Sequence, residues 1–273
     1  MTTQAPAKIN LSLRITGKRG DGFHGLKTLV LPITSLCDEL TFKEADTFSL
    51  KCETPGVPTD ESNLVSRALR LFEKGTGIPC PYEITLTKRI PHGAGLGGGS
   101  ADAAHTFLAL NQLTDAGVPL EKMAGWAAEL GSDIPLFLYE KPCWCTGRGE
   151  IIESAEIKWT APIILFKPSF DIPTPWAYQN WANSQEIPGI SYEPQEADGQ
   201  RLFNDLERPV FEKHRFLATL KSYLQSQSET TAAMMSGSGS TVFAVLDPEA
   251  NAEAFAKETL AAMDPTMWWH VHR

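Results

Sequence analysis

The beginning of the chain alternates apolar and polar residues with the period of a β-strand. Ile9, Leu11, Leu13 and Ile15 are separated by polar residues, so a strand with one buried face is predicted here. Residues 17–25 are rich in glycine and charge and are predicted to form a loop. Similar apolar or alternating runs predict further strands at 26–31, 41–53, 82–86, 163–166, 241–246 and 268–272.

Helical spacing of apolar residues occurs between these strands. It predicts helices at 63–74, 100–113, 120–130, 209–224 and 250–263. Gly75 is expected just past the end of the first helix. The segment 183–199 is polar and rich in proline and glycine, so it is predicted to be a surface connection.

The pattern of apolar and polar residues changes around residues 150–160. The second half of the chain then alternates predicted strands and helices in an order suited to a small α+β layer. A length of 273 residues is enough for one large or two ordinary domains. We therefore predict an α+β protein with two domains, residues 1–155 and 156–273.

Composition and charge narrow the possible functions only a little. The chain is 42% hydrophobic and 21% charged, which is ordinary for a globular protein. Its formal net charge of −9 argues against a general nucleic-acid-binding protein, which would normally present a basic face. A local basic pocket for a phosphorylated small molecule remains compatible with this charge.

Five cysteines are present, an odd number without any CxxC spacing, so neither a disulfide framework nor a zinc site is indicated. Cys143 and Cys145 flank Trp144 on a predicted strand and should face the same way as two small core residues. Free thiols fit a reducing compartment. No apolar run approaches the roughly 20 residues needed to cross a bilayer, so a soluble cytoplasmic protein without membrane or nucleic-acid partners is expected.

A glycine-rich run lies between the predicted strand 82–86 and the predicted helix 100–113. It reads Pro91-His92-Gly93-Ala94-Gly95-Leu96-Gly97-Gly98-Gly99-Ser100-Ala101. Glycine tolerates positive φ and allows close approach to the backbone. A following helix N-terminus presents N–H groups and a positive dipole end, which together favour a phosphate ligand.

Several known phosphate loops can be weighed against this run. The Walker loop requires a Gly-Lys-Ser/Thr ending, and no lysine precedes Ser100. Gly93, Gly95 and Gly98 match the dinucleotide fingerprint GxGxxG, but the only acid at the expected distance, Asp115, follows a helix rather than a strand. The protein-kinase loop would need a following valine and a later strand carrying a lysine, whereas Ser100-Ala101-Asp102 leads into a predicted helix. A glycine-rich hinge without a ligand remains an open alternative.

Six separated segments resemble the GHMP small-molecule kinases. They are Ala5-Pro6-Ala7-Lys8-Ile9-Asn10-Leu11, Gly20-Asp21-Gly22-Phe23-His24, the glycine run, Leu130-Gly131-Ser132-Asp133-Ile134-Pro135, Asn204-Asp205-Leu206-Glu207 and Met235-Ser236-Gly237-Ser238-Gly239-Ser240-Thr241. The resemblance implies an N-terminal domain like ribosomal protein S5 domain 2, which binds ATP, and a ferredoxin-like C-terminal domain. It also implies an ATP-dependent phosphotransferase with an alcohol acceptor.

The same resemblance implies roles for individual residues. Residues 91–101 would bind ATP, with Ser100 at or near the helix N-cap or in contact with phosphate or Mg²⁺. Lys8 and Asp133 would be catalytic, with Asp133 accepting the hydroxyl proton. Mg²⁺ is expected as a cofactor, and its ligands are left open. Ser236 to Ser240 would pack near the first glycine loop and complete the pocket.

Within the family, the loop 20–24 points to members that act on cytidine diphosphate-linked methylerythritol. Phe23 and His24 would hold the cytosine ring, although Phe23 stands where tyrosine is typical and so lacks a phenolic hydroxyl. Asn10, Thr174 and Tyr178 are further candidates for contact with this substrate, though aromatic residues at helical spacing are more often core.

Two alternatives to this interpretation stay open. The chain could be another GHMP kinase, such as a homoserine or mevalonate type, or a non-catalytic nucleotide-binding protein.

The terminal segment Trp268-Trp269-His270-Val271-His272 is predicted to be a strand rather than a His-x-His metal pair. A monomer or weak homodimer is expected.

Overall fold

A long antiparallel hairpin runs through the middle of the computed structural model, which describes residues 1–273. It consists of β1 (Thr2–Lys18) and β2 (His24–Glu44), joined by the predicted loop. The predicted strand 26–31 and the first part of 41–53 are thus one continuous strand, and β3 (Ser49–Lys51) is separate. The separation into two strands was wrong because exposed polar residues around Ser35 interrupt the hydrophobic pattern, and the pairing with β1 shifts its register there, but the strand continues through this irregularity.

The hairpin is the centre of the first sheet. Its strand order is β3-β4-β2-β1-β9-β8, and β5 pairs with β2 and β6. The added strands are β4 (Tyr82–Thr87), β5 (Cys143–Thr146), β6 (Ile151–Ser154), β8 (Gln195–Ala197) and β9 (Gln200–Asn204). Strand β9 runs parallel to β1, so a segment from the second half of the sequence extends this sheet. The division of the chain at residue 155 stays a prediction.

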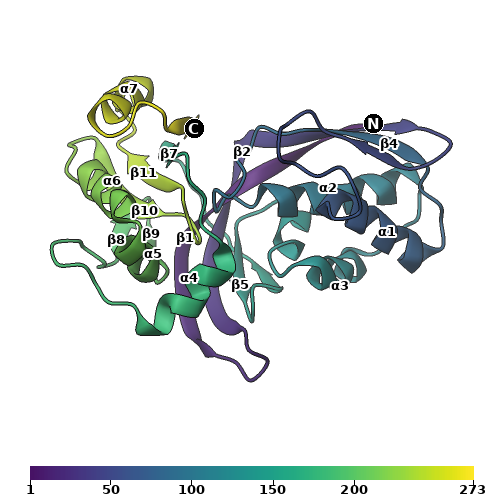
Figure 1. Cartoon of the computed structure of the whole chain (residues 1–273), viewed down its shortest axis with the longest axis horizontal. Helices are drawn as coiled ribbons and strands as arrows, with labels where there is room; N and C mark the ends of the chain where they lie inside the picture. Colours follow the sequence, from purple (N-terminus) through teal and green to yellow (C-terminus); the bar gives the residue numbers. More distant parts are fainter.

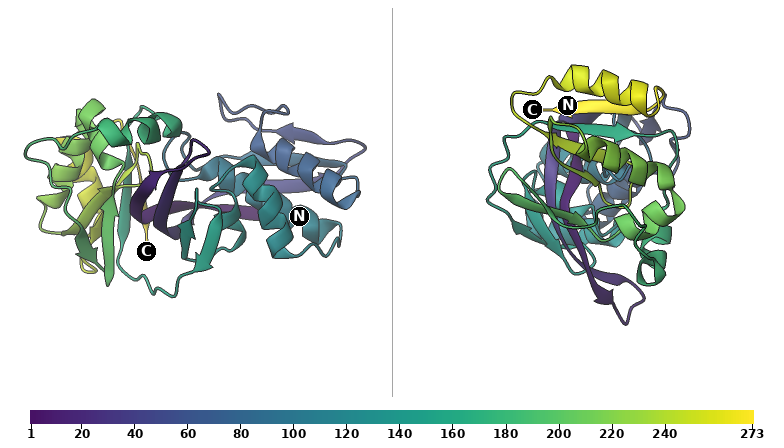
Figure 2. Two further views of the ribbon diagram at one scale, coloured as in Figure 1. Left: turned by 90° about the horizontal axis from the view of Figure 1, so that it is seen from below. Right: turned by 90° about the vertical axis from the view of Figure 1, so that its left-hand side faces the viewer.

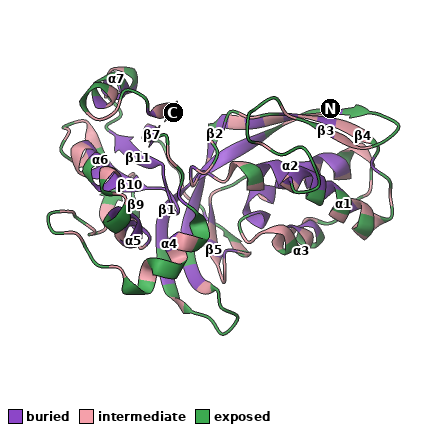
Figure 3. Ribbon diagram, viewed as in Figure 1, coloured by how far each residue is buried: buried purple, intermediate pink, exposed green.

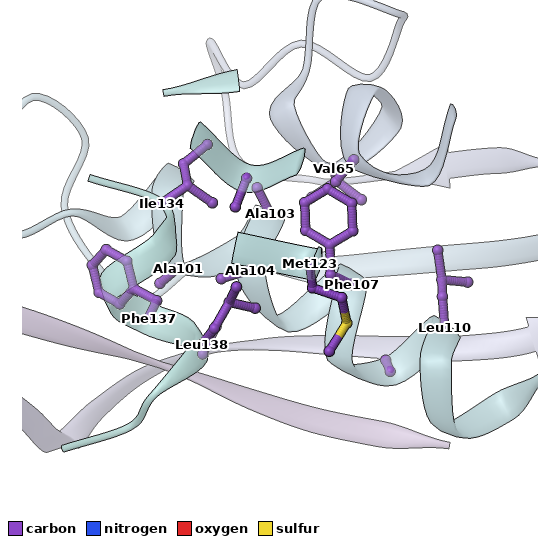
Figure 4. Close-up of a cluster of buried hydrophobic side chains, with 14 of the residues drawn as sticks. Val65, Ala101, Ala103, Ala104, Phe107, Leu110, Met123, Ile134, Phe137 and Leu138 are labelled. Carbon is purple, nitrogen blue, oxygen red and sulfur yellow. The ribbon is translucent and has the colours of Figure 1, made fainter. Parts of the chain in front are cut away.

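Three helices pack on the first sheet (Figure 1). They are α1 (Leu64–Thr76), α2 (Gly98–Leu113) and α3 (Leu120–Leu130). Alanines 101, 103 and 104 let α2 approach its neighbours closely, and Phe107 fills the space between the helices (Figure 4). The short 3₁₀ helix η1 (Pro135–Leu138) closes this core.

Gly75 does not end α1, contrary to the prediction. It lies inside the helix, where a Cβ would be 2.1 Å from the Trp126 ring, so glycine is required there by packing. The helix ends instead at Gly77, whose φ of 74° is the left-handed conformation of a C-cap.

The second sheet has the order β10-β11-β7-β12. Its strands are β7 (Ile163–Lys167), β10 (Thr230–Met235), β11 (Val242–Leu246) and β12 (Trp268–His272), the last forming the predicted terminal strand. Helices α5 (Glu207–Lys213), α6 (Arg215–Gln225) and α7 (Ala252–Ala262) lie on the side away from α1–α3 (Figures 1 and 2).

The single helix predicted at 209–224 is in fact two. His214 adopts φ −112° and ψ 71°, which ends α5 before α6 begins. Its ring stacks on Phe170 at 5.2 Å and meets Trp176 edge-on at 5.9 Å. A tertiary aromatic contact therefore accompanies a break that the local pattern did not reveal.

A third core joins the two sheets. Ala7, Ile9 and Leu11 of β1 pack with residues of the second sheet such as Leu165 and Phe243. Because side chains alternate across a strand, Lys8 and Asn10 project from the opposite face of β1. Figure 3 shows this hairpin as buried over most of its length. Two sheets thus hold the strand that carries the polar site residues.

The remaining structure includes α4 (Thr174–Asn180) and the 3₁₀ turn η2 (Trp181–Asn183). None of the helices combines the length and the apolar character required to pass through a lipid bilayer. All five cysteines are free thiols.

Candidate active site

A cavity of about 400 Å³ opens where the glycine run, the hairpin and the segment containing α4 meet. Both halves of the sequence contribute to its wall. Lys8, Asn10 and Asp133 come from the first half, and Thr174, Tyr178 and the turn 237–238 from the second. The fold therefore gathers most of the predicted site residues around a single space.

The first glycine loop forms one wall of this cavity. Gly95 and Gly97 have φ values of 73° and 74°, which favour glycine. A Cβ at Gly95 would lie 2.4 Å from the carbonyl oxygen of Ser236, so this position has no room for a side chain. The loop leads directly into the N-terminus of α2, which supplies free N–H groups for an anion.

Ser100 does not cap this helix, contrary to one of its predicted roles. The helix begins at Gly98 with Gly97 as N-cap, because the positive φ of Gly97 already turns the chain. Ser100 lies in the first turn and lines the cavity, leaving its hydroxyl available for a ligand. Leu96 and Ala101 are buried in the cores, and the His92 side chain is 86% exposed at the loop surface.

The second glycine loop packs against the first, as the resemblance implied. The Ser236 hydroxyl donates to the Gly95 carbonyl at 3.2 Å, and the Thr241 N–H donates to Ala94 at 3.2 Å. Asn204 holds the second loop from behind by donating to the carbonyls of Met235 and Gly237 at 2.7 and 2.8 Å. The Asn204 segment is thus a support for the site.

Lys8 is almost completely buried beside the cavity. Its ammonium donates to Oδ1 of Asn10 at 2.6 Å and to the Gly95 carbonyl at 2.7 Å. Asn10 in turn donates to the Thr28 hydroxyl at 2.8 Å, which fixes its orientation. Burial lowers the pKa of Lys8, and the nearby charge of Asp133 only partly offsets this.

Asp133 follows α3 and precedes η1. It lines the same cavity as Lys8, whose ammonium donates to Asn10 and to the Gly95 carbonyl rather than to this carboxylate. A Cβ at Gly149 would lie 3.2 Å from Oδ1 of Asp133, so this glycine leaves space around the carboxylate. The carboxylate is therefore held near a buried cation without being neutralised by direct contact.

The predicted substrate residues fall into two groups. Thr174 and Tyr178 line the cavity, and the Thr174 hydroxyl contacts that of Ser238 at 2.8 Å. The His24 ring stacks on Tyr178 at 5.9 Å, behind the cavity wall. Phe23 is 52% exposed, lies outside the cavity lining, and carries the Arg148 guanidinium on its face at 4.9 Å. Its role toward a base stays a prediction.

A buried charge cluster that no sequence pattern predicted lies under the glycine loop. Lys88 bridges Asp38 and Asp102, with 2.7 Å to the latter, and Asp38 also accepts from the N–H groups of Arg89 and Ile90. Burial raises the pKa of Asp102 to about 7 although Lys88 opposes this shift. The cluster ties the start of the loop to α2, and no local sequence pattern pairs three such distant charges.

The cavity offers oxygen atoms suited to a hard cation. No three His, Cys, Asp or Glu side chains gather into a metal-binding group. However, Oδ1 of Asp102 is buried without a hydrogen-bond partner, and both Asp102 and the Ser100 hydroxyl line the cavity. Mg²⁺ with a nucleotide needs only one or two protein oxygens, so these residues fit that ion.

Comparisons with known families agree with this geometry. The GHMP kinases N terminal domain matches residues 63–141, and the GHMP kinases C terminal domain matches residues 193–263. Together these matches cover more than half of the chain, which therefore belongs to the GHMP kinases. The chain has the mixed α/β two-domain fold of this family.

The more similar relatives carry one particular name. A protein of Methylacidiphilum infernorum named 4-diphosphocytidyl-2-C-methyl-D-erythritol kinase is 42% identical over 90% of this chain and 86% of its own length. A crystal structure of 4-(cytidine 5'-diphospho)-2C-methyl-D-erythritol kinase aligns with TM-score 0.79 and 30% identity over 100% of this chain and 98% of that one. A homoserine kinase structure from Cytophaga hutchinsonii shares the fold at TM-score 0.68, with 16% identity over 98% and 93% of the two chains.

Proposed function

We infer that this chain transfers the γ-phosphoryl group of ATP to the 2-hydroxyl of 4-diphosphocytidyl-2-C-methyl-D-erythritol, in the non-mevalonate supply of isoprenoid precursors. The relatives at 42% and 30% identity support this substrate over that of homoserine kinase, which is 16% identical. The observation that carries the chemistry is the single cavity shared by the glycine loop, Lys8 and Asp133.

The proposed reaction forms one oxygen–phosphorus bond and breaks another. The carboxylate of Asp133 accepts the proton of the substrate hydroxyl as its oxygen bonds to the γ-phosphorus, and ADP leaves with the electron pair of the broken bond. Lys8 stabilises the negative charge on the transferred group, since it is buried and hydrogen-bonded only to neutral oxygens. The N–H groups of residues 97–100 hold the phosphates.

Mg²⁺ is proposed to be held by the Ser100 hydroxyl and the Asp102 carboxylate, together with phosphate oxygens. When bound, the ion would neutralise the triphosphate. On the protein side, Lys88 keeps Asp102 in place, and Asp38 keeps Lys88 and the loop backbone in place.

The substrate end is proposed to lie at Asn10, Thr174 and Tyr178. Tyr178 is stacked on His24 and presents an aromatic wall suited to a pyrimidine. Phe23 would have to turn away from Arg148 to form the opposite wall. A cytoplasmic location and a monomer or weak homodimer are kept as predictions.

A turnover assay with the purified full chain tests the function. ADP release should depend on the cytidine diphosphate substrate, and cytidine 5′-diphosphate should compete with it. Equal or faster turnover of homoserine or mevalonate would assign the chain to another member of the family. Nucleotide binding without turnover of any alcohol would indicate a non-catalytic protein.

A further inference from the structure

The connection between β7 and α4, residues 168–173, lies against the glycine loops, and none of its residues lines the cavity. The Ser240 hydroxyl of the second loop donates to the Phe170 carbonyl at 2.6 Å. A Cβ at Gly239 would lie 3.0 Å from Cδ1 of Ile172, so the second loop packs tightly on this connection. The connection therefore supports the second glycine loop from outside the cavity, and it also reaches the first.

Asp171 of this connection meets the first glycine loop where the loop begins. Gly93 has a φ of 60°, and a Cβ on it would lie 2.7 Å from Oδ1 of Asp171, so the carboxyl group packs directly on the loop backbone. Oδ2 of Asp171 lies 3.6 Å from Nδ1 of His92. His92 and Gly93 line the cavity, whereas Asp171 lies behind them. The carboxylate therefore contacts the loop from outside the space that a nucleotide would fill.

Lys167, the last residue of β7, holds this carboxylate in place. Its side chain is 8% exposed, and its ammonium donates to Oδ1 of Asp171 at 2.9 Å. The carbonyls of Pro168 at 3.0 Å and Phe170 at 3.3 Å accept from the same ammonium, so its three N–H groups have three acceptors. Burial alone would raise the pKa of Asp171, but the hydrogen bonds and charges of Lys167 and His92 outweigh it and lower this pKa. The carboxylate is therefore ionised at neutral pH and anchored to a strand of the second sheet.

We propose that Asp171 is a positioning residue for ATP: with Lys167 it ties the first glycine loop to the second sheet and keeps the loop N–H groups directed at the phosphates. This rests on the proposed function, which assigns the phosphates to that loop. Lys167 compensates the charge of the carboxylate, so Asp171 acts through the shape of the loop and not by attracting ATP. The same connection leads into α4, which begins at Thr174 on the substrate side. Both substrates therefore bind against one anchored segment.

Charge and position predict opposite effects for Asp171→Asn. If the carboxylate acted only through its charge, its removal would tighten the binding of the anionic triphosphate. If it holds the loop, loss of the ionic hydrogen bond to Lys167 frees the turn at His92 and Gly93 and weakens binding. The bond is charge-assisted but half-exposed, so the Kd for the nucleotide should rise by about 5–10-fold. The direction of the change therefore separates the two roles.

The direct test is calorimetric titration of a non-hydrolysable ATP analogue, with Mg²⁺, into the full chain and into Asp171→Asn. Unchanged or tighter binding by the variant overturns the proposal. The matched control is Asp247→Asn, which removes an exposed carboxylate of the same half of the chain that accepts only from the nearby Glu249 N–H. The control should bind the analogue as the wild type does, and an equal rise of Kd in the control would also overturn the proposal.

A double-variant cycle tests the contact between Asp171 and the loop. Gly93→Ala places a methyl group against the carboxylate and also strains the backbone at a φ of 60°, so analogue affinity should fall. In an Asp171→Gly background only the strain remains, and the same substitution should cost at least about 3-fold less affinity. Equal costs in the two backgrounds overturn the contact. If Gly93→Ala does not fold, the binding measurement on Asp171→Asn decides the question alone.

Turnover adds a readout that a merely structural role would not move. In Asp171→Asn the KM for ATP should rise by about the same factor as the Kd, while kcat and the KM for the alcohol substrate change by less than about 2-fold. The reason is that Asp171 does not line the cavity that holds Lys8 and Asp133. A fall in kcat at unchanged KM for ATP would overturn the positioning role. Failure of the proposed function would appear differently, as no turnover by the wild type while analogue binding can still be measured.

Discussion

Two buried lysines in this chain have opposite surroundings. Lys221, 1% exposed on α6, donates to Glu207 at 2.6 Å and to the Ser191 carbonyl at 2.8 Å. Glu207 also accepts from the Met235 N–H at 2.9 Å, so this buried charge is fully paired. Lys8, 4% exposed on β1, contacts only neutral oxygens and borders a cavity.

The difference separates a structural charge from one that is available to a ligand. Burying a charge costs several kcal/mol unless a partner compensates. Lys221 has a carboxylate partner within the chain, whereas Lys8 is hydrogen-bonded only to neutral oxygens. The Lys8 ammonium is therefore suited to an anionic ligand such as a phosphoryl group. Asp133, near Lys8 but not in direct contact with it, belongs to the same open arrangement.

The largest effect is expected for Asp133→Asn. If Asp133 accepts the hydroxyl proton, turnover should fall by about 10²–10⁴-fold with ATP binding kept. If Asp133 were instead the structural partner of Lys8, as Glu207 is of Lys221, the variant would mainly lose stability. Rapid-mix turnover and urea unfolding of the same preparation separate these outcomes.

Lys221→Met should cost about 3–5 kcal/mol of unfolding free energy, because it leaves Glu207 as an unpaired buried charge. Turnover per folded molecule should stay near that of the wild type, since neither residue lines the cavity. The double variant Lys221→Met/Glu207→Gln is the control and should recover much of the lost stability. Equal losses in both variants would contradict a buried ion pair.

Lys8→Met should show the reverse pattern. Loss of one preorganised donor to developing charge costs about 10²–10³-fold in kcat. The unfolding free energy should change less than in Lys221→Met, because water in the cavity can reach the freed oxygens. Normal kcat in this variant would remove Lys8 from the mechanism.

Lys88→Met tests an intermediate case, because Lys88 is paired and also lines the cavity. It should lose about 3–5 kcal/mol of stability, since Asp38 and Asp102 are left as buried carboxylates without their cation. The KM for ATP should rise more than kcat falls. An effect on stability alone would place Lys88 with Lys221.

The smallest effect is a pH dependence of stability. Burial lowers the pKa of Lys8 below 10.5, so between its folded and unfolded pKa values the folded chain binds fewer protons than the unfolded chain. Stability from this group therefore rises with pH toward 10.5 and is lost as pH falls. The difference in urea midpoint between wild type and Lys8→Met should shift in favour of the wild type as pH rises. A constant difference would show that Lys8 is not desolvated.

Local sequence patterns correctly predicted the helices and strand faces that depend on neighbouring residues alone. Residues 120–130 form a helix with the predicted ends, and Lys8 and Asn10 share the face that strand alternation assigned them. The predicted helix boundaries were wrong where contacts with residues distant in the sequence influence the structure. The Trp126 ring leaves no room for a side chain at Gly75 inside α1, and the aromatic neighbours of His214 accompany the break between α5 and α6. The cluster around Lys88 joins residues up to 64 positions apart, from Asp38 to Asp102, without a pattern to reveal it.

By itself, the sequence determined the glycine loop and the helix after it, because backbone conformation and helix polarity depend on neighbouring residues. It also determined the resemblance to one family of kinases, which rests on short separated segments. It also offered Lys8 and Asp133 as candidates. Only the tertiary structure decided which buried charges are neutralised and which remain open. That depends on which side chains meet in the folded chain, and a buried charge left without its partner costs about 3–5 kcal/mol.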